Sequence, residues 1–312
     1  MPGHFRLLDL ARRAAPALGF LAAIAAVPAL ADTPACNGKP GAMGTARTIE
    51  VDTTGGADFG TMQYRSTLPL RPKEIIFTFD DGPNPEHTPK ILDVLDRHCI
   101  KATFFVVGRY AELHPEIVRD AWARGHTIAT HTWSHPILSR MSYKASVRQI
   151  DRGIGATRAA LAGLEDLEGR PARVAPFFRF PGLNHTSRLR RYLAANDIAT
   201  FSCDMGTDDW RRISPWTLYK RALRMIEYKG SGIVIFHDTH HRTSTMLDKI
   251  LDELARRGYQ AVHMVPRGHA RPAQPELAAS AIGARPSSPQ LSATDGQPVT
   301  DTSPTLRPSV AN

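Results

Sequence analysis

Residues 75–83 have the sequence Ile-Ile-Phe-Thr-Phe-Asp-Asp-Gly-Pro. The first five form a short apolar and β-branched run, which is ended by two carboxylates and a Gly-Pro pair. A run of this kind predicts a buried β-strand with polar side chains at its carboxyl end. Six further runs follow along the chain, at residues 103–107, 127–130, 175–180, 200–203, 233–236 and 260–265.

Segments of helical period lie between these runs, at residues 88–98, 115–124, 143–161, 187–196, 215–228 and 244–257. One of them begins at Ser214-Pro215, where a capping hydroxyl precedes a proline at the first helical position. Alternation of strand and helix implies a parallel sheet, and seven such units indicate a barrel that is not complete. We therefore predict an α/β fold, an incomplete, distorted (β/α)7 barrel with mostly parallel strands.

The first 31 residues have the layout of a secretory signal peptide. Arg6, Arg12 and Arg13 precede an apolar run, 14–30, that closes on Ala-Leu-Ala at 29–31. A membrane anchor is the alternative, but two prolines interrupt the run and it is shorter than the roughly 20 apolar residues of a spanning helix. We expect cleavage after Ala31, an exported protein that is periplasmic or secreted, and no stable membrane span after cleavage.

Composition divides the rest of the chain into three parts. Residues 32–70 are rich in Gly and Thr and predict an extended N-terminal extension, and residues 71–266 carry the alternating pattern. In residues 267–312 Pro, Ser, Ala, Thr and Gln dominate, and a segment with so little to bury is expected to be disordered.

The chain is basic, with 312 residues and a formal net charge of +9, and it stays basic without the signal peptide. A basic surface outside the cytoplasm favours an anionic envelope or an acidic glycan as partner. Nucleic acid would require a recognition motif, and none is found. Thiols oxidise outside the cytoplasm, so Cys36 and Cys99 are expected to pair and Cys203, in an apolar run, to stay free, although three cysteines permit three pairings.

Candidate functional side chains lie where the predicted strands end, which is where the active sites of parallel barrels are found. Asp80 and Asp81 follow the first strand directly, and two adjacent carboxylates repel unless a cation offsets the cost. A pair of solvated turn aspartates is the alternative. After the third strand stand His131 and His135, four residues apart and expected on one face of a helical turn. One carboxylate and two imidazoles leave positions open for water and substrate, as in catalytic metal sites.

These two motifs resemble the first two of the NodB-like polysaccharide deacetylases, carbohydrate esterase family four. The remaining motifs follow in the expected order, at residues 179–182 (Arg-Phe-Pro-Gly), 209–210 (Asp-Trp) and 235–237 (Ile-Phe-His). The resemblance covers roughly residues 71–266. It implies an enzyme that removes acetyl groups from N-acetylglucosamine units of a polysaccharide or chitooligosaccharide by attack of a metal-bound water.

The resemblance also implies a metal site. Asp81, His131 and His135 would bind one divalent ion, with zinc as the first choice and cobalt or nickel as alternatives. The ion would polarise the acetamide carbonyl and acidify bound water.

The other roles are carried over in the same way. Asp80 would be the general base, with Arg179 holding it ionised and aimed, and His237 the general acid that protonates the leaving amine. Asp209 would orient His237. Three further residues would bind substrate: a pocket for the acetyl methyl group would be shaped by Trp210 and Ile235, and a backbone N–H near Gly182 would help to stabilise the oxyanion.

Two positions depart from the family pattern. The fourth motif often has an aspartate where this chain has Gly206, and the third usually has an aromatic residue and then glycine where this chain has Gly182 and Leu183. Both loops would border the sugar, so these departures affect substrate fit rather than the proposed chemistry. His240 and His241 are adjacent loop histidines with no further carboxylate at ligand spacing, and no second metal site is expected there.

Two rival functions remain open. A metal-independent amide or imide hydrolase of the same fold would not need the ligand set Asp81, His131 and His135. A non-catalytic glycan-binding module would not need His237 or Arg179. The N-acetylated glycan itself is left open between chitin oligosaccharide, peptidoglycan and an exopolysaccharide.

Overall fold

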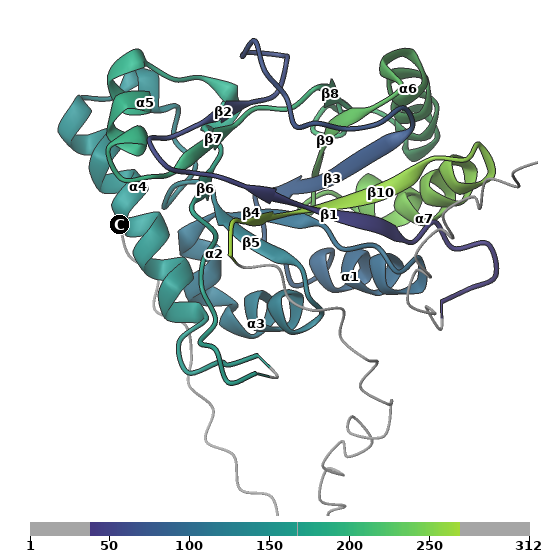
Figure 1. The fold of residues 1–312 in the computed structure, drawn as a ribbon, viewed down its shortest axis with the longest axis horizontal. Helices are drawn as coiled ribbons and strands as arrows, with labels where there is room; N and C mark the ends of the chain where they lie inside the picture. Colours follow the sequence, from purple (N-terminus) through teal and green to yellow (C-terminus); the bar gives the residue numbers. More distant parts are fainter. Residues whose placement is uncertain (1–37, 167, 269–312) are drawn as a thin grey trace, which may run out of the picture. The chain divides into compact units, whose positions relative to one another are not determined.

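A computed structural model describes residues 38–166 and 168–268 (Figure 1). They belong to the first of two units into which the chain divides, Met1–Ala270 and Arg271–Asn312. The predicted signal peptide and most of the predicted tail lie outside the described residues. In the described part of the chain, no helix is both long and apolar enough to cross a membrane.

All strand pairings of the ten-stranded sheet are parallel, which confirms the predicted class and a distorted barrel. β3 lies at its centre and pairs with β4, β9 and β10. The strands are β1 (Thr45–Val51), β2 (Asp58–Phe59), β3 (Glu74–Asp80), β4 (Thr103–Val106), β5 (Thr127–Thr130), β6 (Phe177–Phe178), β7 (Ala199–Phe201), β8 (Met205–Gly206), β9 (Gly232–His237) and β10 (Gln260–Pro266).

Helices cover the outside of this sheet (Figure 1). Their boundaries follow local sequence: α6 begins after Ser214, whose hydroxyl accepts a hydrogen bond from the N–H of Thr217. It ends at Lys229 and is capped by Gly230, with φ 76°. The helices are α1 (Thr88–Arg97), α2 (Gly108–Leu113), α3 (Pro115–Ala123), α4 (Tyr143–Ala160), α5 (Ser187–Ala194), α6 (Pro215–Lys229) and α7 (His241–Arg256).

Alternation along β3 decides which side chains face the barrel interior. Phe77 and Phe79 belong to the outer apolar layer that packs against the helices, whereas Ile76 belongs to the inner layer. Because side chains alternate along a strand, Thr78 and Asp80 share the inner side with Ile76. The strand therefore directs a carboxylate into the interior at its carboxyl end.

The N-terminal extension contains more regular structure than the sequence predicts. β1 pairs with β10, and β2 pairs with β7. Near the start of β1, the Thr45 hydroxyl donates to the carbonyl of Cys99, and Cys99 is disulfide-bonded. Cys203 is buried and free, as predicted. Cys36 lies outside the described residues, so its pairing with Cys99 stays a prediction.

Candidate metal centre and active site

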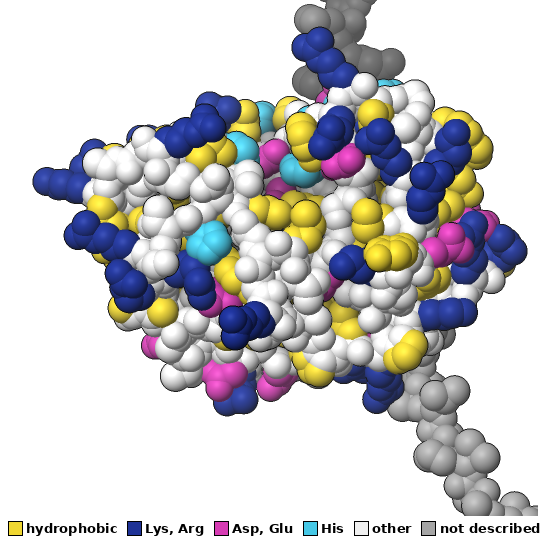
Figure 2. Space-filling model, turned by 90° about the horizontal axis from the view of Figure 1, so that it is seen from above, with side chains coloured by type: hydrophobic (Ala, Val, Ile, Leu, Met, Phe, Trp, Pro, Cys, Tyr) yellow, Lys and Arg dark blue, Asp and Glu magenta, His cyan; other side chains and the backbone are white. Residues whose placement is uncertain are grey.

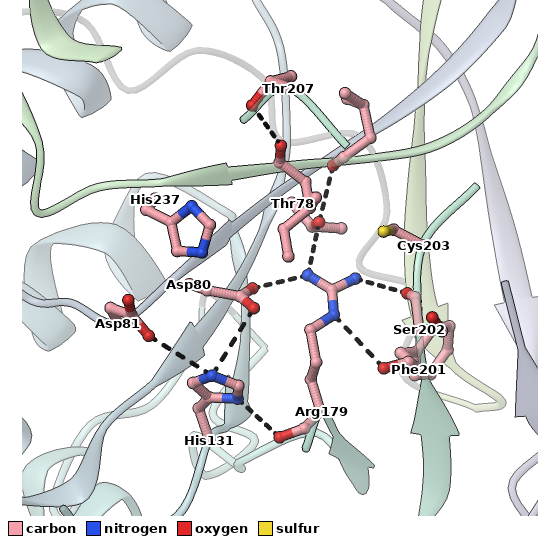
Figure 3. A network of polar contacts seen from close by, with 12 residues as sticks. Thr78, Asp80, Asp81, His131, Arg179, Phe201, Ser202, Cys203, Thr207 and His237 are labelled. Carbon is pink, nitrogen blue, oxygen red and sulfur yellow. Dashed lines mark hydrogen bonds and ion pairs between the residues drawn. The ribbon is translucent and has the colours of Figure 1, made fainter. Parts of the chain in front are cut away.

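The carboxyl ends of three strands bring the predicted site residues together. Asp80 ends β3 and is paired in register with His237, the last residue of β9. His131 follows β5 directly. In Figure 3, Asp80 and Asp81 lie between the imidazoles of His131 and His237. The parallel sheet therefore gathers side chains that are far apart in sequence.

Three potential ligand atoms converge beside these strand ends. The Nε2 atoms of His135 and His131 lie 3.1 and 3.4 Å from Oδ1 of Asp81. One ligand atom from each of the three residues can be chosen so that all lie within 4.8 Å of one another. The residues that the sequence singled out as metal ligands are thus close enough to share one ion.

The backbone brings the two histidines together by a route that differs from the prediction. Residues 131–137 form a loop, and Thr132 and His135 have φ values of 68° and 60°. The expected helical turn is therefore wrong. Hydrogen bonds fix the loop, since the Thr132 hydroxyl accepts from the N–H of His135 and the Gln149 carbonyl accepts from the N–H of Trp133.

His131 has the tautomer that a metal ligand needs. Its Nδ1 lies 2.6 Å from the carbonyl oxygen of Arg179, a partner to which only a protonated nitrogen can donate. Nε2 is then left with its lone pair facing Asp81. Burial lowers the pKa of His131 and favours the neutral ring, the form that binds metal.

The donor set fits a divalent transition metal. Oδ1 of Asp81 is buried and makes no hydrogen bond among the described residues, although its carboxylate has two imidazoles beside it. Burial alone would raise the pKa of Asp81, but His135 and His131 outweigh it and hold the pKa below its usual range. An ionised carboxylate with two imidazoles is a donor set that suits zinc, cobalt or nickel.

Asp80 lies between a buried arginine and His131, and its Oδ2 is 3.8 Å from Nε2 of His131 (Figure 3). Nη1 of Arg179 donates to Oδ1 of Asp80 at 2.6 Å and to the hydroxyl of Thr78 at 2.8 Å. Nη2 donates to the carbonyl of Ser202 at 2.9 Å, and the guanidinium lies 4.1 Å from the ring centroid of Phe105. Since Arg179 is fully buried, these contacts fix its charge against one oxygen of Asp80 and leave Oδ2 available.

His237 is held by Asp209. Nδ1 of His237 lies 2.6 Å from Oδ1 of Asp209, and its backbone N–H donates to Oδ2 at 2.7 Å. The hydroxyl of Thr243 donates to the same oxygen. Burial lowers the pKa of His237, but the charge and hydrogen bond of Asp209 more than offset this and raise it to about 9. The imidazole is therefore protonated at neutral pH.

The three proposed substrate-binding residues lie in the surrounding strand ends and loops. Trp210 follows Asp209, and its side chain is exposed, with the guanidinium of Arg211 4.8 Å from its ring centroid. Ile235 is partly buried in β9, and Gly182, with φ 59°, lies in a 3-10 turn after β6. Among the described residues, no hydrogen bond or ring contact joins their side chains to the metal ligands.

The histidines at 240 and 241 point to different neighbours. The ring of His240 lies 5.8 Å from that of His237, and the ring of His241 lies 6.0 Å from that of His87.

Figure 2 shows a face on which histidine and acidic side chains gather in a hollow, while lysines and arginines are spread around its rim.

Sequence reasoning missed Asp238, the residue after His237. Its Oδ2 accepts a hydrogen bond from the hydroxyl of Thr88 at 2.7 Å, and burial raises its pKa to about 7. A Cβ on Gly82 would lie 2.0 Å from this oxygen, so the carboxyl packs directly under the turn that follows Asp81. The available clue was its place, immediately after an apolar strand and a candidate catalytic histidine.

Comparisons with known proteins agree with this geometry. A family model described as polysaccharide deacetylase matches residues 68–201. A peptidoglycan-N-acetylmuramic acid deacetylase of Bacillus subtilis is 32% identical over 65% of this chain, and the match spans only 40% of that relative's length. A chitooligosaccharide deacetylase of Bradyrhizobium is 31% identical over 63% of this chain and 91% of its own length.

Solved structures share the fold. A peptidoglycan deacetylase from Bdellovibrio bacteriovorus has a TM-score of 0.60 and 29% identity, covering 71% of this chain and 59% of its own. A structure from Bacillus anthracis, with a TM-score of 0.53 and 23% identity over 62% of this chain and 64% of its own, is described as a pseudoenzyme of carbohydrate esterase family four. The chain belongs to the polysaccharide deacetylase family, the NodB-like carbohydrate esterases of family four.

Proposed function

We propose that the protein is an exported, metal-dependent hydrolase that removes acetyl groups from N-acetylglucosamine units of a polysaccharide or oligosaccharide. The observation that carries this proposal is the convergence of Asp81, His131 and His135 between two charged pairs, Asp80–Arg179 and His237–Asp209. A glycan-binding module would need neither of these buried pairs.

Asp81, His131 and His135 would hold the metal. When bound, the ion supplies Lewis acidity that polarises the acetamide carbonyl and makes water a better nucleophile at neutral pH. The carbonyl of Arg179 contributes indirectly, because it fixes the tautomer and ring orientation of His131.

Asp80 would act as the general base. Arg179 occupies Oδ1, so Oδ2 is the oxygen that can accept a proton from the attacking water. The hydrogen bond from the buried guanidinium of Arg179 keeps the base in place.

His237 would act as the general acid. With Nδ1 bound to Asp209, Nε2 carries the proton that can pass to the departing sugar amine. Protonating the nitrogen makes it a better leaving group, and the C–N bond then breaks to give acetate and the free amine. Asp209 serves as a positioning residue that stabilises the protonated ring.

Three residues would contact the acetyl group and the reacting centre. We assign Trp210 and Ile235 to the walls of the methyl pocket, and a backbone N–H near Gly182 to the oxyanion. Export to the periplasm or beyond is supported by the basic and apolar start of the chain and by the disulfide at Cys99, since disulfides persist in oxidising compartments.

The test is acetate release from a panel of chitin oligosaccharides, peptidoglycan and an acetylated exopolysaccharide, with zinc, cobalt or nickel added. We expect acetate from at least one glycan, loss of activity on chelation and recovery with zinc. Activity that survives complete removal of metal would favour the metal-independent hydrolase. Glycan binding without acetate release under any metal would favour the binding module.

A further inference from the structure

The N-terminal extension supplies a loop beside the proposed active site. β2 pairs with β7, and the chain then forms the loop 60–67 before it reaches β3. We call this segment the Met62 loop. In Figure 1 it rises as a dark blue loop between β2 and β8. None of the five motifs lies in it.

Asp204 fastens both ends of the Met62 loop to the barrel. This buried carboxylate accepts hydrogen bonds at 2.8 Å from both the N–H and the hydroxyl of Thr61, and at 2.6 Å from the hydroxyl of Thr67. Within the loop, the carbonyl of Ser66 accepts from the N–H of Gly60. A Cβ on Gly60, with φ 108°, would lie 2.6 Å from the backbone nitrogen of Cys203. The loop therefore lies tightly against the barrel.

The Met62 loop contacts both places where this chain departs from the family pattern. The sulfur of Met62 lies 3.9 Å from the point where a Cβ on Gly206 would stand. The side-chain amide of Gln63 donates to the carbonyl of Leu183. One loop thus covers the glycine in the fourth motif and the altered residue in the third.

These contacts place Met62 near the proposed methyl pocket. Gly206 is paired in register with Ile235, two residues before His237. The Met62 sulfur also lies 3.2 Å from the buried sulfur of Cys203, yet 55% of the Met62 residue is exposed. Met62 therefore contacts a buried thiol and Gly206 of β8, while more than half of the residue is exposed to solvent. β8 in turn pairs with β9, which ends at the proposed catalytic residue His237.

We propose that Met62 and Gln63 form one wall of the sugar-binding cleft and determine how the glycan fits, in place of the side chain that Gly206 lacks. The thioether presents a polarisable, apolar surface to the C–H face of a pyranose ring of the substrate, and the bond from Gln63 to Leu183 holds the wall in position. This inference rests on the proposed deacetylase function and names two residues that select its substrate.

Steady-state kinetics test the wall in the zinc-loaded mature protein. Met62→Ala should raise the KM for the pentamer of N-acetylglucosamine by about fivefold to tenfold, the effect of losing a few buried methylene contacts, and change kcat less than twofold. Hydrolysis of 4-nitrophenyl acetate, which has no sugar, should be unchanged. Met62→Leu keeps the apolar bulk and should stay close to the original protein. Gln63→Ala should raise the KM for the pentamer less than Met62→Ala does.

Tyr228→Ala is the matched control, because Tyr228 is an exposed aromatic residue near the far end of α6, one residue before its last residue Lys229. It should change neither substrate's kinetics. If Met62→Ala lowered activity on the ester and the pentamer equally, the residue would have a structural role only and the proposal would be overturned. An unchanged KM for the pentamer would overturn it as well.

Calorimetry separates this proposal from the proposed function. Pentamer affinity is measured in the Asp80→Asn protein with and without Met62→Ala, so no turnover is needed. Weaker binding of the pentamer by the double variant supports the Met62–Gln63 wall, whether or not the original protein releases acetate. Absence of acetate release would contradict only the proposed deacetylase function. Equal affinities would contradict the wall, whatever the activity.

Discussion

Two clusters of histidine and aspartate in the described residues each have three potential metal-ligand atoms within 4.8 Å of one another. One contains Asp81, His131 and His135, and the other contains His98, Asp248 and Asp252. In the second cluster the ammonium of Lys39 lies 2.9 Å from Asp248 and 2.6 Å from Asp252, so the protein supplies its own cation. In the first, the buried arginine pairs with the neighbouring Asp80 instead.

The histidines of the two clusters also use opposite nitrogens. Nε2 of His98 lies 2.9 Å from Asp248, whereas the hydrogen bond of His131 is made by Nδ1, to a backbone carbonyl. Nε2 of His131 makes only longer contacts, 3.4 Å to Asp81 and 3.8 Å to Asp80. Proximity of ligand-type residues is therefore a weak criterion. The partners of each nitrogen and the presence of a side-chain cation decide which cluster is suited to an ion.

The largest effect is expected for a substitution of Asp80 that removes the general base and leaves the metal ligands in place. Asp80→Asn should lower acetate release about 100-fold to 10,000-fold, because the general base is lost, while zinc content stays near that of the original protein. Asn still offers an oxygen to Arg179, so the fold should survive. The measurements are acetate release across a zinc titration and metal content of the purified protein. Restoration of turnover by added zinc would contradict the assignment of Asp80 as base.

Two matched substitutions then compare the clusters as ligand sets. Asp81→Asn exchanges an anionic ligand for a neutral one, so zinc should bind more weakly and excess zinc should restore part of the activity. Asp248→Asn should leave zinc content and turnover unchanged, because Lys39 and not an ion lies between the aspartates. Equal loss of zinc in both variants would show that the two clusters do not differ as described.

The pH dependence of turnover tests the contrast between two buried histidines. Burial lowers the pKa of His98, whereas Asp209 raises that of His237 to about 9. A general acid must be protonated, so kcat should fall as pH rises through the pKa of His237. Asp209→Asn should move this alkaline limb to lower pH, because the neutral amide no longer stabilises the imidazolium. An unmoved limb would mean that another group controls it.

Lys39→Met tests what keeps an ion out of the second cluster. Its ion pairs are partly exposed and contribute little, so the free energy of unfolding should fall by only about 0.5 to 1 kcal/mol. Without the ammonium, zinc bound per chain at excess zinc should rise above one. Chemical denaturation and equilibrium dialysis measure the two effects. A stoichiometry that stays at one would mean that ligand geometry, and not Lys39, excludes the ion.

Local patterns predicted the parts of this fold that depend on local physics. The apolar run of β3 and the capped start of α6 at Ser214 both lie close to where sequence placed them. The proximity of Asp81, His131 and His135 also followed from their places at strand ends. Their backbone did not, because a loop with φ values near 60° depends on hydrogen bonds to Gln149, a residue on another element.

These local patterns could not predict contacts between residues that are far apart in the sequence. β1 is mostly polar and partly exposed along its first half, and it becomes a strand because β10 pairs with it. Asp238 gains its place under Gly82 from the β3–β9 register, and Met62 reaches Gly206 only after β2 joins β7. None of these partners is close in sequence.

The pairing of β1 with β10 has a consequence for how the chain folds. Thr45 is paired with Ala261 and Val51 with Pro266, so one of the first strands finds its partner only when the last is made. Until β10 has been synthesised, the backbone N–H and C=O groups of β1 have no partner strand. Pairing the two strands requires closing a loop that contains most of the domain. Folding should therefore be slow and occur after translation of the domain is complete, and the unpaired edges of β1 and β3 are where an unfinished chain would meet another copy or a chaperone.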